Sequence, residues 1–383
     1  MSKNINQKVA EIFTEIAEAI ESGSFGKKRR IGLTILGSEH APAELVKGAE
    51  LAMSRYSDLE IILIGSGVES QLTSLPAADL DECHQVMEKA LADGVIEGCV
   101  TLHYNFPIGV STVGRVITPA GGKEMLIATT TGSSDVDRVN AMVKNSLYGL
   151  AVAKALGQEN PRLGILNIDG ANLVGRKLKQ LQKQGYELSF AESARADGGI
   201  TMRGNDLLQA TPDVMVCDTL TGNLMMKIFS SYTTGGSYEA MGFGYGPGIG
   251  EDYDSVISII SRASGAPVIS NAIRYTADVI NGQVKSVIET EMQKARQAGL
   301  AKILAPAQQE EKVVKTAICP SAKIVGEQIA GIDILEIEQA KEKLWTEKIY
   351  AETGMGCTGP IVIVAAEDLE KSRTILRTAG YIE

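Results

Sequence analysis

Short apolar segments alternate with helical segments along most of this chain of 383 residues. Apolar runs of strand length are predicted at seven places, namely 31–36, 59–64, 99–103, 125–129, 162–167, 214–217 and 255–260. Helical periodicity falls between or after them, at 41–56, 80–92, 135–156, 172–184, 222–231 and 267–298. Strands that are joined through helices pair in parallel and are covered on both faces. The chain is therefore expected to form an α/β fold built on a parallel sheet.

The two ends of the chain differ from this alternating core. Residues 5–20 have amphipathic helical spacing, and residues 299–312 are rich in Ala, Pro, Gln and Glu with little periodicity. Beyond that seam, a helix near 336–351, a loop at 354–360 and a strand at 361–365 indicate a small separate unit. We predict three parts: an N-terminal helix at 1–24, a core at 25–310 and a C-terminal module at 311–383.

Charge and cysteine content limit the possible partners. The formal net charge is -10 and no long basic cluster occurs, so nucleic acid is not an expected partner. The start of the chain has no apolar signal core, and no apolar run approaches the length that spans a membrane. The 5 cysteines are far apart and form no C-x-x-C pair, which indicates neither a disulfide framework nor a zinc site. We expect a cytoplasmic protein without a metal, a cofactor or a membrane partner.

A cysteine between glycines is the strongest chemical signal in the sequence. Gly354, Gly356 and Gly359 match the spacing of a dinucleotide-binding loop, but a helix is predicted before them and a strand after them, which is the wrong context. What remains is Cys357, flanked by Gly356 and Thr358. Inward-turned backbone N–H groups in such a loop would lower the pKa of the thiol and stabilise an oxyanion. The alternative is a small structural residue in a tight turn.

A second signal lies at the end of the apolar run 214–216, where Thr221, Gly222 and Asn223 open a predicted helix. The carboxyl ends of strands in open α/β sheets, followed by a helix start, are where such folds bind ligands and phosphate. Ser133 and Ser134 occupy a similar hydroxyl-rich turn after 125–129. Both places are predicted to bind a phosphate or acyl group, although a capped helix after a strand would give the same pattern.

A glycine-rich stretch and an arginine are further candidates for a phosphate or acyl site. The stretch 234–250 contains seven glycines, with Gly235 and Gly236 at its start. This composition indicates a mobile segment that covers a bound ligand. A surface loop without such a role is the alternative. Arg262 follows the apolar run 255–260, where a guanidinium group can hold phosphate through two hydrogen bonds. A solvated turn is the alternative for Arg262.

The core resembles the PlsX-like phosphate acyltransferases of phospholipid synthesis. The resemblance rests on six stretches, namely 139–143, 151–157, 159–168, 204–208, 213–214 and 221–223. The Thr-Gly-Asn turn and the pair Ser261-Arg262 also look like phosphate acetyltransferase. This resemblance implies the two-domain, isocitrate dehydrogenase-like fold of those enzymes, with an acyl phosphate bound in the cleft between two lobes.

The segment Gly354–Pro360, the stretch 367–370 and the stretch 238–244 resemble another family across nearly the whole chain, the alpha subunits of protein C of glycine, sarcosine and betaine reductases. That resemblance implies an oxidoreductase complex of amino-acid fermentation. Selenoprotein A would deliver a carboxymethyl group, protein C with its beta subunit would convert the group to an acetyl thioester, and phosphate would release acetyl phosphate. It implies that Cys357 is the nucleophile and that phosphate is a co-substrate.

Two other functions stay open on the sequence. The chain would be a stand-alone phosphate acyltransferase or phosphate acetyltransferase, using acyl carrier protein or coenzyme A, if Cys357 is only structural. Alternatively, it would be a non-catalytic subunit that docks a catalytic partner.

Overall fold

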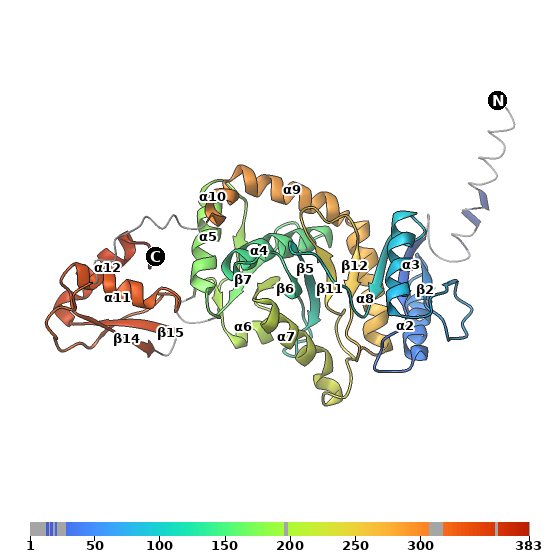
Figure 1. Ribbon diagram of the computed structural model, residues 1–383, viewed down its shortest axis with the longest axis horizontal. Coiled ribbons are helices and arrows are strands. Elements are labelled where there is room, and N and C mark those ends of the chain that lie inside the picture. Colours follow the sequence, from blue (N-terminus) through green and yellow to red (C-terminus); the bar gives the residue numbers. More distant parts are fainter. Residues whose placement is uncertain are drawn as a thin grey trace, which may run out of the picture.

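The computed structural model describes residues 28–194, 198–305, 317–356 and 359–382, together with a few residues between 13 and 20. The helix predicted over 5–20 therefore lies largely outside the described residues. A continuous sheet runs through the core, and the C-terminal module lies at one end of the molecule, far from the first strands of the core (Figure 1).

The sheet of the core contains 12 strands. Their order is β3-β2-β1-β4-β12-β11-β5-β6-β10-β7-β8, and β9 pairs with β7. Their bounds are β1 (Arg29–Thr34), β2 (Leu59–Ile64), β3 (Ser74–Leu75), β4 (Gly98–Thr101), β5 (Val110–Ile117), β6 (Glu124–Ser133), β7 (Arg162–Leu166), β8 (Ser189–Phe190), β9 (Thr201–Met202), β10 (Val214–Val216), β11 (Gly246–Ile249) and β12 (Ile257–Ile259).

Two sets of parallel strands are joined by antiparallel ones. Strands β3, β2, β1, β4 and β12 are parallel neighbours in the first lobe, and β6, β10, β7 and β8 are parallel neighbours in the second. Between the lobes, β11 pairs antiparallel with both β12 and β5, and β5 pairs antiparallel with β6. The predicted α/β class and two-lobe fold are confirmed. The sheet is mostly parallel, as predicted, and the antiparallel strands β5 and β11 are the part that the sequence analysis did not recognise.

Helices cover both faces of this sheet (Figure 1). In the core they are α2 (Pro42–Arg55), α3 (Leu80–Ala92), α4 (Arg138–Ala155), α5 (Ala171–Lys183), α6 (Gly204–Leu208), α7 (Thr219–Ser231), the short 3-10 helix η1 (Tyr232–Thr234), α8 (Ala266–Asn281), α9 (Val284–Gln297) and α10 (Leu300–Leu304). Helix α4 is buried along most of its length, as expected for a helix between a sheet and an outer helix. No described helix is long and apolar enough to cross a membrane.

Several boundaries differ from the prediction for local reasons. The long helix predicted at 267–298 is two helices, because the chain turns at Gly282 and Gln283, whose φ of 52° lies in the left-handed region. Helix α4 begins at Arg138 rather than near 135, because the side chain of Asp137 accepts a hydrogen bond from the Asn140 N–H and caps it. Gly246–Ile249, predicted to belong to a mobile cover, is the buried strand β11.

The C-terminal module has a sheet and a hydrophobic cluster of its own. Its sheet has the order β13-β15-β14, and its elements are β13 (Glu327–Ile329), α11 (Ile337–Thr346), β14 (Ala351–Gly356), β15 (Gly359–Val364), η2 (Ala366–Asp368) and α12 (Leu369–Thr378). Ten buried residues between Ile329 and Leu376 pack together as a cluster distinct from those of the core. The loop predicted over 354–360 is mostly antiparallel hairpin, since the strand β14 runs to Gly356.

Candidate functional site

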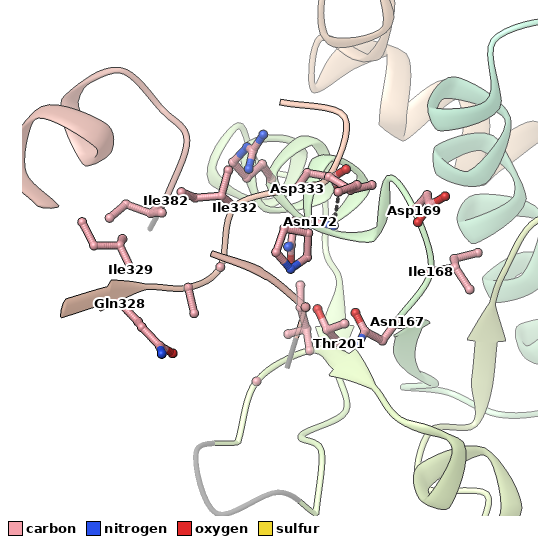
Figure 2. A pocket seen from close by; sticks show the side chains of 18 of the residues that line it. Asn167, Ile168, Asp169, Asn172, Thr201, Gln328, Ile329, Ile332, Asp333 and Ile382 are labelled. Atoms are coloured by element: carbon pink, nitrogen blue, oxygen red, sulfur yellow. Dashed lines mark hydrogen bonds between the residues drawn. The ribbon is translucent and has the colours of Figure 1, made fainter. Parts of the chain in front are cut away.

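The junction between the core and the C-terminal module encloses a cavity of about 810 Å³. Asn167 and Thr201 line it from the core, just beyond β7 and at the start of β9 (Figure 2). Ile329, Ile332 and Ile382 line it from the C-terminal module (Figure 2). We call this cavity the junction pocket. It lies at the carboxyl end of a parallel strand, where open α/β sheets bind ligands.

The junction pocket has a positive lining in an acidic chain. Its charged residues are Arg176 and Lys179 of α5, Arg373 and Arg377 of α12, and the carboxylates Asp169 and Asp333. The cations are spaced three residues apart on α5 and four apart on α12, so each pair shares one face of its helix. Two helices from different parts of the chain therefore direct positive charge to one cavity.

Asp333 fixes the C-terminal module to the first turn of α5. Its carboxylate is 3% exposed and accepts hydrogen bonds from the backbone N–H groups of Gly170 and Asn172, both at 3.2 Å. Figure 2 shows this contact between Asp333 and Asn172. Arg176 of the same helix forms an ion pair with Glu336 and donates to the carbonyl of Tyr381. The module thus supplies the cap that the α5 start lacks, since Gly170 has no side chain.

The hairpin β14–β15 reaches the junction pocket. Met355, Gly359 and Pro360 line the cavity, and Met355 pairs with Pro360 while Gly356 pairs with Gly359. The predicted nucleophile Cys357 and its neighbour Thr358 lie outside the described residues. Met355, two residues before Cys357, and Gly359, directly after Thr358, belong to the lining of the pocket.

The described cysteines differ sharply in reactivity. Cys83, Cys99 and Cys217 are buried, and Cys319 is exposed. Burial raises the pKa of the Cys83 thiol to about 11, and it also raises the pKa values of the Cys99 and Cys217 thiols. Because the thiolate is the nucleophile, these three thiols are poorly suited to covalent chemistry at neutral pH. Among the described residues, no group of His, Cys, Asp and Glu is arranged to hold a metal ion.

The Thr221 turn lies one strand away from the junction pocket, after β10, the neighbour of β7 in the sheet. Its donors are used within the protein. Asp218 accepts hydrogen bonds from the N–H and the hydroxyl of Thr221, at 3.1 and 2.7 Å, and the Asn223 amide donates to the carbonyl of Thr130. Burial disfavours the charged form of the Asp218 carboxyl group and by itself raises the pKa. The hydrogen bonds from Thr221 and the charge of Arg138 have a larger effect, so the pKa of Asp218 is lowered. The turn is a well-capped helix start.

Gly222 has a steric role in that turn. A methyl group at its Cα would collide with the carbonyl oxygen of Thr129 in β6, so only glycine lets α7 pack this close to the sheet. The assignment of phosphate binding to Thr221, Gly222 and Asn223 stays a prediction.

The other predicted residues are spread along α7. Ser133 and Ser134 lie at the end of β6, near the start of α7, and their hydroxyls donate to the carbonyls of Asp135 and Ala141. Gly235 and Gly236 lie beyond the other end of α7, where the N–H of Gly236 donates to the Ser231 carbonyl. Ser231 is ten residues after Thr221, which is about 15 Å along a helix.

Arg262 belongs to this far end as well. Its side chain is exposed. The carbonyl of the adjacent Ala263 accepts a hydrogen bond from the Glu239 N–H. The next residue, Ala240, donates its N–H to the carbonyl of Ser230 in the last turn of α7. The structure therefore brings Ser133 and Ser134 near the Thr221 turn, but places Arg262, Gly235 and Gly236 at the opposite end of the helix. Gly356 lies at the end of β14, in the C-terminal module.

Comparison with known proteins agrees with this architecture. The profile of a family described as "Fatty acid synthesis protein" matches residues 29–363. The glycine/sarcosine/betaine reductase complex component C subunit alpha of Peptoclostridium acidaminophilum is 53% identical over 382 residues, covering 99% of each chain. The chain belongs to the family of that component C alpha subunit.

More distant relatives match only part of this chain. A phosphate acyltransferase of Bacillus mycoides is 25% identical over 235 residues, which are 52% of this chain and 70% of the relative. Among solved structures, a branched-chain phosphotransacylase from Enterococcus faecalis is 16% identical, with a TM-score of 0.47, and the match covers 65% of this chain and 99% of that one.

Sequence reasoning missed the cations of the junction pocket. Arg176 and Lys179, like Arg373 and Arg377, have the spacing of neighbours on a helix face, and that spacing was visible in the sequence. Nothing in the sequence indicated that α5 and α12, about 190 residues apart, would face one cavity.

Asp333→Ala is expected to loosen the junction between the core and the C-terminal module. The substitution leaves the N–H groups of Gly170 and Asn172 without their acceptor, which costs about 2 kcal/mol at a buried helix start. Hydrogen exchange at these two amides should accelerate, and thermal unfolding should begin at a lower temperature. Asp169→Ala, at an exposed neighbouring carboxylate, is the matched control. Equal exchange rates in the two variants would contradict this role of Asp333.

Proposed function

We propose that this chain transfers an acetyl group from a thioester on Cys357 to inorganic phosphate, as the acetyl phosphate-forming subunit of a glycine, sarcosine or betaine reductase. The position of the β14–β15 hairpin carries the proposal, because residues on both sides of Cys357 line a cationic pocket at the carboxyl end of β7. The similarity to a component C alpha subunit and to phosphate acyltransferases supports it.

The chemistry of this step balances without a further reactant. A phosphate oxygen attacks the thioester carbonyl carbon and forms a C–O bond, while the carbonyl oxygen takes up negative charge. When the carbonyl re-forms, the C–S bond breaks, acetyl phosphate leaves, and Cys357 is returned as a thiolate. A thiolate is a good leaving group, so a thioester is a suitable acyl donor to a weak nucleophile such as phosphate.

The proposed partners supply the acetyl group. In this proposal, selenoprotein A brings a carboxymethyl group and the beta subunit takes part in its conversion to the thioester on this chain. For this conversion to balance, a carboxymethyl selenoether and two thiols give an acetyl thioester, a selenium–sulfur bond and water, so Cys357 would accept the acetyl group and a thiol of a partner would take the selenium. The C-terminal module, whose sequence includes Cys357, lies at one end of the molecule (Figure 1) and would be the part that these partners approach.

The reverse reaction tests this function on the isolated chain. Acetyl phosphate should acetylate the protein, peptide mapping should find the acetyl group on Cys357, and arsenate should drive the breakdown of acetyl phosphate. Coenzyme A should not be required.

Two results would refute the proposal. An acetyl phosphate turnover that depends on coenzyme A or acyl carrier protein, with no acetyl group on Cys357, would identify a stand-alone acyltransferase. No turnover by the isolated chain and full turnover by the beta subunit alone would identify a docking subunit.

A further inference from the structure

We propose that the junction pocket is the binding site for inorganic phosphate, and that Arg373 of α12 holds the anion within the positive lining to which Arg377, Arg176 and Lys179 belong. This inference rests on the proposed function, and it names the residues that would bring the co-substrate to the thioester. It differs from the assignment of phosphate to the Thr221 turn.

The charges favour an anion over a cation or a neutral ligand. Four cationic side chains line the cavity against two carboxylates, in a chain of net charge -10. One of those carboxylates, Asp333, already accepts hydrogen bonds from the two N–H groups at the start of α5, and Arg176 forms an ion pair with Glu336. Guanidinium groups present two parallel donors that match the geometry of a phosphate.

The existing partner of Arg373 leaves room for a phosphate. Arg373 forms an ion pair with Glu370 at 3.1 Å, but both side chains are exposed, at 44% and 84% of their surface. An exposed pair of this kind contributes between 0 and about 1 kcal/mol, so Arg373 can turn to an anion in the pocket at little cost. Arg176 is fixed by Glu336 and the Tyr381 carbonyl, so its charge is held in place from the core side.

Neutral donors complete the lining. Asn167 and Thr201 face the cavity from the core, and Gln328 lies on the module side (Figure 2). Amide and hydroxyl donors among cations are the usual composition of an oxyanion site. By contrast, the hydroxyls of Thr221, Ser133 and Ser134 already donate to acceptors within the protein.

Isothermal titration of the full chain with inorganic phosphate tests the site directly. We expect Arg373→Gln to weaken phosphate binding about tenfold, since a hydrogen bond to a charged group contributes about 1.5 kcal/mol. The double variant Arg373→Gln with Arg377→Gln should lose binding further. Lys371→Gln, on the same helix with an exposed side chain outside the lining, removes the same charge and should change the affinity less than twofold.

The outcomes separate this inference from the proposed function. Equal weakening by Arg373→Gln and Lys371→Gln would show a general charge effect and overturn the site. Binding of coenzyme A without binding of inorganic phosphate would overturn the ligand. Because binding is measured rather than turnover, Cys357→Ala should still bind phosphate through the pocket. If Cys357→Ala keeps turnover while Arg373→Gln weakens binding, the proposed function fails and the phosphate site stands.

Discussion

Cys357→Ala will abolish acetyl phosphate turnover while the protein stays folded. Loss of a covalent nucleophile removes the acyl intermediate itself, so we expect a decrease of at least about 10⁴-fold. The rate of arsenate-driven breakdown of acetyl phosphate measures the effect, and circular dichroism measures the fold. Cys319→Ala is the control, because Cys319 is the exposed cysteine among the described residues.

Thiol labelling offers an independent measure of the same assignment. Mild iodoacetate should alkylate Cys357 first and Cys319 more slowly, while the buried Cys83, Cys99 and Cys217 stay protected until the protein unfolds. Prior acetylation with acetyl phosphate should block the label at Cys357 alone. Alkylation of Cys217 before Cys357 would contradict the nucleophile assignment.

A chain that ends near residue 310 is expected to fold and to lose acetyl phosphate chemistry completely. The large sheet and its three hydrophobic clusters lie between residues 29 and 304, and the C-terminal module packs around a cluster of its own. Truncation removes the hydrogen bonds of Asp333 and the ion pair of Glu336, which is a local cost at α5 of a few kcal/mol.

Far-UV circular dichroism and thermal unfolding measure the fold of the truncated chain, and the arsenate reaction measures its activity. The full chain with Cys357→Ala is the control, since it lacks the nucleophile but keeps the module. Full activity in a folded truncated chain would show that the module and Cys357 are dispensable. That result would favour a stand-alone acyltransferase.

The sequence predicted the strands that alternate with helices well, but it missed the central strands β5 and β11. β2 and α3 match their predicted ranges, because buried apolar runs and a capped amphipathic helix give strong local signals. β11 was missed because its sequence, Gly-Pro-Gly-Ile, has no strand propensity, and its conformation is imposed by pairing with β5 and β12.

The predicted site divides in a similar way. The strand ends near Thr221 and Ser134 were found from local patterns, and the structure places them in one region of the second lobe. The separation of Arg262 from that region depends on the reversal of strand direction at β5 and β11, which no local pattern reveals. The cations of the junction pocket depend on how the C-terminal module packs on α5, and this is decided by the buried Asp333.

The contact of Asp333 with α5 has a consequence for selectivity. An open helix start attracts anions, and in a core without the module the first turn of α5 would offer such a place. In this chain the carboxylate of Asp333 occupies the start of α5. Because this carboxylate belongs to the same polypeptide, it competes with free anions at an effective concentration in the millimolar range. The N–H groups of Gly170 and Asn172 are therefore not open to a free anion. If phosphate binds at the junction pocket as proposed, this internal carboxylate would act as a competitive inhibitor at the helix start and would leave the anion to the adjoining site.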